Sequence, residues 1–308
     1  MKVVVAGGSG ALGRRLCADL AARGDDVVVL ARRPDPRAPH RQVAWDGETV
    51  GPWAAELRDA DAVVNLAGAL VDRRPTPAAV ELLTTSRVRP TRALAEAATL
   101  RDGPVPVWVQ ASTAAVHGDA GDTVLTESSP PADGPPQMAG VARAWEAAAA
   151  DLPAVRTVVL RTSVVLDAGT PALDRLLLLT RWGLGGRVGS GRQWFSWLHV
   201  DDWLAVLRWA LDAPTADGVV LATSPHPVRN AELMATLRAV VGRPPAPPTP
   251  APLLRLGAAL LRTDPALGLT GRRAVPARLL AEGFVFAHPH LRPALEDLLA
   301  RPTERHRP

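Results

Sequence analysis

The sequence predicts an α/β fold whose parallel sheet is doubly wound, with helices on both faces. Two observations support this prediction. Short β-branched runs alternate with segments of helical periodicity, which is typical of a parallel sheet covered on both sides. A glycine-rich turn at residues 7–13 joins the first run directly to the first helical segment, so the chain opens with a strand, a tight turn and a helix.

The elements follow in order along the chain. The β-branched run at 3–6 predicts a buried strand, and leucines at helical spacing predict a helix over 14–23 that Gly24 ends. A strand at 27–30 then completes a βαβ unit. The same patterns predict strands at 62–65, 105–109, 155–160 and 219–221, and helices at 77–98, 137–150, 201–211 and 230–241.

The last quarter of the chain has a different composition. Six prolines within residues 244–252 predict a stiff, extended connector. Residues 253–299 are predicted to form a small, mainly helical unit, and the polar tail at 301–308 to be disordered.

Composition excludes several classes of protein. With 308 residues, 47% hydrophobic and 21% charged, the chain is long enough for a sizeable core and is not predicted to be disordered. No apolar stretch of about 20 residues lacks a charge or a proline, so no membrane span is expected. The first apolar run is too short for a secretory signal. The single cysteine, Cys17, permits no internal disulfide, so we expect a cytoplasmic protein.

The basic pI does not indicate a nucleic-acid partner. The formal net charge is only 35 − 31 = +4, and the pI of 10.6 arises because one lysine, one cysteine and no tyrosine leave almost nothing to titrate above histidine. The arginines are scattered among acids rather than gathered into a stripe. We therefore expect a small-molecule partner and no nucleic acid.

The glycine-rich turn has the spacing of a phosphate cradle. Gly7, Gly10 and Gly13 recur every third residue: the first permits the turn, the second lets a pyrophosphate approach the backbone, and the third lets helix pack on strand. Backbone N–H groups of Ala11 and Leu12 would face the anion at the helix start. A glycine turn without a ligand is the alternative, but the flanking strands favour Rossmann-type dinucleotide binding.

The end of the second strand indicates which cofactor is bound. An acidic residue there would bind the ribose of NAD, whereas Arg32 and Arg33 suit the 2′-phosphate of NADP(H) by charge and bidentate geometry. Exposed arginines are common in this chain, so the alternative is that Arg32 and Arg33 are ordinary surface residues without a role in cofactor binding.

Residues 7–13 and 65–68 resemble the extended short-chain dehydrogenases/reductases. Four further segments narrow the resemblance to the atypical bacterial "epimerase family" subgroup, which ends in a small domain of unknown function: 86–91, 145–148, 161–166 and 189–199. It implies that Leu66, Ala67, Gly68 and Ser112 contact the cofactor. It also implies an NADP-binding domain at 1–165 plus 200–225, and a substrate-side portion at 166–199 plus 226–300.

The catalytic pattern departs from that family. Thr113 occupies the position of the family's Ser/Thr, but the positions of its Tyr and Lys hold Met138 and Ala142. The chain has no tyrosine, and its lone lysine is Lys2. His117 has a suitable pKa to move a proton instead, in which case His117→Ala should lower kcat about 100-fold or more. A hydrogen-bonded loop histidine and a bound water are the alternatives.

Other residues have weaker signals. Gln193, Trp197 and His199 fall in the substrate-side segment and are candidate substrate contacts, with His199 expected to begin a helix. Glu127 and Asp72 are expected to be solvated loop acids, and Cys17 to lie in the core. No spacing of histidines and carboxylates indicates a metal site.

The sequence therefore predicts an NADP-dependent oxidoreductase or epimerase-like enzyme acting on an unidentified small molecule. An NADP-binding sensor or scaffold without turnover is one alternative, and a lyase or isomerase that reuses the fold is another. The alanine-rich helices at 77–98 and 137–150 leave both a monomer and a homodimer open.

Overall fold

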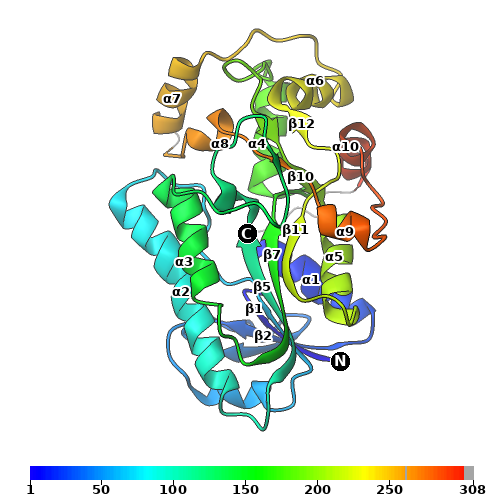
Figure 1. The fold of residues 1–308 in the computed structure, drawn as a ribbon. Helices are drawn as coiled ribbons and strands as arrows, with labels where there is room; N and C mark the ends of the chain where they lie inside the picture. Colours follow the sequence, from blue (N-terminus) through cyan, green and yellow to red (C-terminus); the bar gives the residue numbers. More distant parts are fainter. Residues whose placement is uncertain (261, 302–308) are drawn as a thin grey trace.

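A single parallel sheet forms the centre of the molecule (Figure 1). The computed structural model describes residues 1–260 and 262–301. Seven strands pair side by side in the order β11-β7-β5-β4-β1-β2-β3, all parallel. Their bounds are β1 Lys2–Ala6, β2 Asp26–Ala31, β3 Arg41–Ala44, β4 Ala62–Asn65, β5 Val105–Thr113, β7 Ala154–Thr162 and β11 Gly218–Ala222. The predicted Rossmann-type α/β fold is confirmed.

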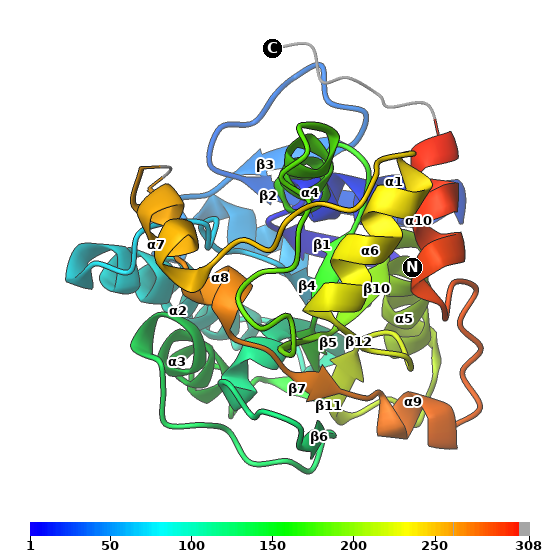
Figure 2. The ribbon, with the colours of Figure 1, turned by 90° about the horizontal axis from the view of Figure 1, so that it is seen from above.

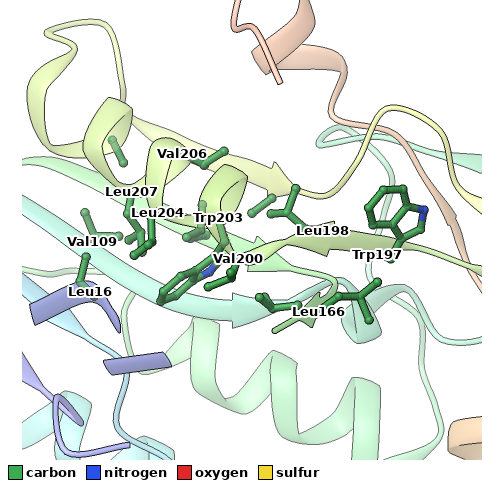
Figure 3. Close-up of a cluster of buried hydrophobic side chains, with 14 of the residues drawn as sticks. Leu16, Val109, Leu166, Trp197, Leu198, Val200, Trp203, Leu204, Val206 and Leu207 are labelled. Carbon is green, nitrogen blue, oxygen red and sulfur yellow. The ribbon is translucent and has the colours of Figure 1, made fainter. Parts of the chain in front are cut away.

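The strand residues alternate between two hydrophobic cores, one on each face of the sheet. In β1, Val3 and Val5 pack in the cluster that contains Leu16 of α1 (Ala11–Ala22) and Trp203 of α5 (Val200–Asp212). Figure 3 shows part of this cluster around Leu16, Val109 and Trp203. Val4 and Ala6 face the other way, toward α2 (Pro77–Ala98), which lies with α3 (Val141–Ala147) on the opposite side of the sheet in Figure 1. Both faces are therefore buried, which explains the continuous valine runs.

Smaller elements stand at the carboxyl end of the sheet. Short strands pair as β8 with β10, β9 with β12 and β6 with β13. Their bounds are β6 Val124–Leu125, β8 Val164–Leu166, β9 Trp194–Phe195, β10 Trp197–His199, β12 Val228–Arg229 and β13 Arg273–Ala274; the helices are α4 Pro171–Arg181, α6 Asn230–Val240, α7 Ala251–Leu260, α8 Ala266–Leu269, α9 Ala277–Ala281 and α10 Leu291–Ala300. Figure 2 shows the chain running from α7 through α8 to α9 across the top of the sheet.

The structure corrects several predicted elements. The helix predicted over 137–150 is a π-helical turn, η3 (Pro136–Gly140), followed by α3, which ends at Ala147. The edge strand β3 was not predicted, because its residues are half-exposed or exposed and lack a β-branched run. The helix α4 was not predicted either. The proline-rich connector is shorter than expected, since α7 already begins at Ala251.

The core does not stop at the predicted boundary between the two portions. One cluster joins β1 and α5 to Leu166, Leu173, Leu233 and Leu295 of the substrate-side portion. The proposed division of the chain stays a prediction. Of the tail predicted to be disordered, residues 302–308 lie outside the described residues.

Candidate functional site

The glycine turn lies where the direction of strand order reverses, between β1 and β4. Leu66, directly after β4, donates its backbone N–H to the carbonyl of Ala6 at the end of β1 (2.8 Å). Open α/β sheets bind their ligands outside the carboxyl ends of the strands at this reversal. The fold therefore places the predicted cradle where the class binds its ligands.

Steric and backbone constraints differ among the three glycines of the turn. Gly7 has φ +82° and a Cβ there would lie 2.7 Å from the carbonyl carbon of Leu66, while a Cβ at Gly13 would lie 2.3 Å from the Gly7 oxygen. The backbone therefore requires both. Gly10 has an ordinary φ of −71°. Beyond its chain neighbours, the one described heavy atom within 4 Å of a Cβ there is Gly7 O, at 3.3 Å. Apart from this one tight contact, the space beside Gly10 is open among the described residues.

The start of α1 faces the same space. Gly10 is the N-cap of α1 and provides no side-chain cap, and the first turn holds no acidic residue. The backbone N–H groups of Ala11, Leu12 and Gly13 have no carbonyl within the helix to bind, because the first N–H groups of any α-helix have no intrahelical acceptor. These N–H groups and the positive end of the helix dipole suit a phosphate.

The other wall of the site is held by Asn65. Its buried amide donates to Thr91 Oγ1 (2.9 Å) and Gln110 Oε1 (3.1 Å), and its Oδ1 accepts from the N–H of Ala67 (3.1 Å). These bonds fix the segment at 66–68, in which Gly68 is exposed. A Cβ at Gly68 would meet Arg87 Cζ at 3.0 Å, so the turn packs directly on that side chain.

The two arginines after β2 are free to bind an anion. Arg32 and Arg33 are both exposed, and within residues 1–260 and 262–301 neither forms a hydrogen bond or an ion pair. A shallow pocket follows directly, lined by residues between Pro34 and Gln42. The structure thus leaves their guanidinium groups available, as the sequence interpretation requires.

Thr113 ends β5 at the carboxyl edge of the sheet. It is half-buried, and its Oγ1 accepts from the N–H of Ala115 (3.1 Å), which caps the 3₁₀ turn η2 (Ala114–His117). The neighbouring Ser112 points to the opposite face, where its Oγ donates to Glu146 Oε1 (2.5 Å). The hydroxyl of Ser112 is therefore part of a buried network, while that of Thr113 lies at the rim.

His117 belongs to the same buried network as Ser112. Arg161 donates to both oxygens of Glu146, from Nε (2.9 Å) and Nη2 (2.8 Å), and its Nη1 lies 3.5 Å from His117 Nε2. His117 Nδ1 lies 3.1 Å from the carbonyl oxygen of Pro130. A carbonyl only accepts and a guanidinium only donates, so the ring is held neutral with its proton on Nδ1.

Burial lowers the pKa of His117, and the positive charges of Arg161 and Arg272 lower it further, against the opposing Pro130 bond. His117 is 4% exposed, and both of its ring nitrogens are engaged. These contacts favour a structural role over the proton transfer expected from the sequence, which stays a prediction.

Arg272, from the C-terminal segment, contacts Met138, the residue at the position where the family has its tyrosine. Met138, in η3, is 9% exposed, and Arg272 Nη2 lies 3.3 Å from its Sδ. The Nε of Arg272 is buried and has no hydrogen-bond partner in the described part of the chain. Sequence reasoning missed Arg272, because 134 positions separate it from Met138 and nothing in its local sequence distinguishes it from the other arginines.

The three candidate substrate residues have structural partners. Gln193 Nε2 donates to the carbonyls of Val188 (3.1 Å) and Gly268 (2.8 Å). Trp197 is fully buried and donates from Nε1 to His226 O (3.1 Å). His199 is also fully buried and, as expected, begins a helix. None of the hydrogen bonds that the described residues make joins these three to Thr113.

Three further expectations concern acids and the cysteine. Glu127 and Asp72 are half-buried and paired rather than free in solvent. Glu127 accepts from the N–H groups of Leu221 (3.2 Å) and Arg278 (3.3 Å), and Asp72 binds Arg175 and Thr263. These bonds join distant segments, which no local pattern could indicate. Cys17 is buried as expected, and burial raises the pKa of its thiol to about 12.

Four possible metal ligands converge although the sequence showed no such spacing. Single ligand atoms of His199, Asp201, His288 and Asp297 lie within 4.8 Å of one another. Arg301 binds both carboxylates of the group, with its Nη2 2.6 Å from Asp297 Oδ2. A guanidinium cation therefore already compensates the two acids.

Buried His199 makes stability depend on pH. Burial lowers its pKa from 6.5 to about 4, and the charges of His288 and Arg301 outweigh the opposing Asp201 and Asp297. The unfolded chain therefore binds a proton between about pH 6.5 and 4 that the folded chain does not, so stability falls as pH falls through this window. We expect a loss on the order of 3 kcal/mol in the free energy of unfolding by pH 4.

Urea unfolding of His199→Asn between pH 7.5 and 4 tests this. Asparagine can still cap α5 by accepting from the Asp201 N–H, so the variant should fold and show a flatter profile. His40→Asn is the matched control and should keep the wild-type slope. Equal slopes for all three proteins would contradict the assignment.

Comparisons with known proteins agree with this geometry. The model of the NAD dependent epimerase/dehydratase family matches residues 3–221, and that of a domain of unknown function, DUF1731, matches residues 249–298. The human epimerase family protein SDR39U1 is 35% identical over 305 residues, covering 97% of this chain and 100% of the relative. A crystal structure of that human protein (isoform2) with NADPH superposes with a TM-score of 0.87 at 34% identity, covering 98% of this chain and 100% of the other.

More distant structures share the fold. MoeE5 in complex with UDP-glucose and NAD has a TM-score of 0.74 at 23% identity, covering 97% of this chain and 98% of the other. Within the described residues, no helix is long and apolar enough to cross a membrane. A relative from Arabidopsis thaliana, 32% identical over 97% of this chain and 87% of its own length, is named as chloroplastic, so the expected cytoplasmic location stays a prediction.

Proposed function

This chain belongs to the NAD dependent epimerase/dehydratase family, and from that premise we propose that it is an NADP(H)-dependent oxidoreductase or epimerase-like enzyme acting on a small molecule. The observation that carries the proposal is the space beside Gly10, bordered by the open N–H groups of α1 at the reversal of strand order. The relative that carries NADPH supports the choice of cofactor.

The described residues suit two parts of the cofactor, its central pyrophosphate and the 2′-phosphate of its adenosine half. The N–H groups of Ala11 and Leu12 would hold the pyrophosphate, and Gly7, Gly10 and Gly13 let the backbone approach it. Arg32 and Arg33 would bind the 2′-phosphate, while the segment at 66–68 would line the opposite wall. When bound, NADP(H) supplies the hydride donor or acceptor of the reaction.

The residues around Thr113 define what the chain itself contributes to the chemistry. We infer that its hydroxyl orients a substrate oxygen, since it is the half-buried hydroxyl at the carboxyl edge of β5. A threonine hydroxyl does not act as a base by itself near pH 7. Because His117 is held as a neutral donor to Pro130, a bound water or a group of the substrate would carry the proton.

A carbonyl panel tests turnover. Purified protein with NADPH should oxidise the cofactor, followed at 340 nm, with at least one aldehyde or ketone, and Thr113→Val should slow this reaction at nearly constant side-chain volume. A protein that binds NADPH but consumes it with no member of the panel would contradict the oxidoreductase proposal.

Because the family's catalytic tyrosine and lysine are absent, we also consider functions that need no hydride transfer. Met138 and Ala142 cannot ionise, and the lone lysine, Lys2, is paired with Asp59 at the far end of the sheet. An NADP(H)-binding protein without turnover would need only the cradle, and a lyase or isomerase would need only the pocket. Tight NADPH binding with no oxidation by the panel would favour these readings. Whether the chain is a monomer or a homodimer stays a prediction.

Arginines 32 and 33 predict the cofactor preference. The double variant Arg32→Ala/Arg33→Ala should lose the preference for NADPH over NADH, because each lost charge-assisted pair costs about 1.5–3 kcal/mol, or roughly tenfold or more in affinity. Calorimetry with both cofactors measures this, and NADH binding should change little. Arg37→Ala, in the same loop, is the control. Equal affinity of the wild-type protein for NADPH and NADH would contradict the assignment.

A further inference from the structure

Arg272 is a half-buried residue whose Nε is buried and has no hydrogen-bond partner among the described residues. Its backbone is fixed, with the N–H donating to Trp194 O (3.1 Å) and the carbonyl accepting from Ser196 Oγ (2.8 Å). Among residues 1–260 and 262–301, no carboxylate lies within ion-pair distance of its guanidinium. The negative charge of Asp119 acts on Arg272 from beyond ion-pair distance. A buried N–H without a partner is costly, and the Nε of Arg272 is such a group.

The edge of the guanidinium that lacks a partner is the one this chain uses elsewhere to bind carboxylates. Arg15 binds Asp167 through Nε (3.0 Å) and Nη2 (3.1 Å), and Arg161 binds Glu146 through the same two atoms. In Arg272 that edge holds a bare Nε and an Nη2 directed at the Sδ of Met138. A thioether is only a weak hydrogen-bond acceptor and carries no charge. The Met138 sulfur therefore occupies the position of a carboxylate without neutralising the guanidinium.

The fold brings Arg272 to the carboxyl edge of β5. The preceding residue, Gly271, donates its N–H to Asp119 Oδ1 (3.2 Å), two residues after η2. A Cβ at Gly271 would lie 2.4 Å from the backbone N and O of Trp194, so the segment is fixed on both sides. Met138 lies in η3, which packs on η2 directly after Thr113. The charge of Arg272 also acts on His117 of η2, so Arg272 stands near the turn that directly follows Thr113.

We propose that Arg272 is a substrate-binding residue whose Nε and Nη2 bind a carboxylate of the substrate after the flexible Met138 thioether moves aside. This inference rests on the proposed function for its location and narrows the substrate to a small acid. A planar guanidinium edge donates two parallel hydrogen bonds, which matches the two oxygens of a carboxylate. The unbranched methionine side chain can change rotamer at little cost.

Calorimetry with oxalate as the probe tests the proposal on the full chain saturated with NADP⁺. Arg272→Met should weaken oxalate binding about tenfold or more, the loss expected for a charge-assisted bidentate pair. Arg272→Lys keeps the positive charge but not the two parallel N–H donors of the guanidinium. Its affinity for oxalate should lie between those of the wild type and Arg272→Met. Met138→Ala should bind oxalate more tightly than the wild type, because no side chain has to move.

Arg273→Met is the matched control. Arg273 is the adjacent residue of β13 and lies 4.6 Å over the Trp194 ring, so its loss should change oxalate affinity less than about twofold. Thermal unfolding separates binding from structure. Since no carboxylate lies within ion-pair distance of Arg272 among the described residues, Arg272→Met should keep the Tm close to that of the wild type.

Three results would overturn the proposal: no oxalate binding by the wild type, equal binding by the wild type and Arg272→Met, or a clear fall in Tm for Arg272→Met. Preference for methyl phosphate over oxalate would overturn the carboxylate class. A separate NADPH titration tests the proposed function independently. If the cofactor does not bind, the oxalate series on the cofactor-free chain still decides the role of Arg272.

Discussion

Gly10→Val should abolish NADPH binding and leave the protein folded. The valine side chain would fill the space at the start of α1 that a pyrophosphate needs, and its Cβ would meet one described backbone atom, Gly7 O, at 3.3 Å. The φ of Gly10, −71°, suits any residue, so the strain that a glycine turn can impose is absent here. Calorimetry with NADPH should therefore show no binding, while thermal unfolding stays cooperative with at most a modest fall in Tm, because Gly7 O has to move by a few tenths of an ångström.

Two further glycine variants are controls, one for replacing any glycine by valine and one for disturbing the turn itself. Gly257→Val replaces a helical glycine whose Cβ would meet nothing within 4 Å among the described residues, and it should leave NADPH binding intact. Gly13→Ala places a Cβ 2.3 Å from Gly7 O and should lower both stability and binding. A folded Gly10→Val protein that binds NADPH normally would show that the glycine loop is only a turn.

Arg161→Met should lower the free energy of unfolding by about 3–5 kcal/mol, the loss found when one partner of a buried ion pair is removed. The side chains of Arg161 and Glu146 are 6% and 18% exposed, and their Nη2–Oε2 distance is 2.8 Å. Without the guanidinium, the carboxylate keeps only the hydroxyl of Ser112 as a described side-chain donor. Urea unfolding measures the change.

A surface pair and a double variant provide the controls. Arg292 and Glu296 form an exposed pair, 59% and 51% exposed, so Arg292→Met should cost at most about 1 kcal/mol. The double variant Arg161→Met/Glu146→Met should be more stable than Arg161→Met alone, because no uncompensated charge stays buried. A double variant that is less stable than Arg161→Met would contradict this account of the network.

The geometry of the glycine turn was predictable because its parts are close in sequence, whereas its role in cofactor binding stays a prediction. Gly7, Gly10 and Gly13 act through a turn and the helix that follows it, and Arg32 follows the very next strand. Such local units keep their geometry wherever they occur, since the turn, the helix dipole and the strand pairing all lie within one βαβ unit. The parallel sheet was predictable for the same reason, from β-branched runs that alternate with helices.

The substrate half depends on contacts between distant segments. His117 was expected to face the pocket, but Arg161 and Glu146 hold it in a buried network. His199 was a candidate substrate contact, yet it caps α5 and meets Asp297 of α10, 98 positions away. Neither burial nor a partner so far along the chain can be read from local spacing.

The sequence by itself determined the fold class, the glycine turn before α1 and the absence of the usual tyrosine and lysine, because each follows from residue types at short spacing. Tertiary structure alone decided that Arg272 lies against Met138, that four possible metal ligands meet at Arg301, and that Glu127 joins two distant segments. The physical reason is that an ionisable group has no fixed role until folding sets its burial and partners, which depend on the whole chain at once.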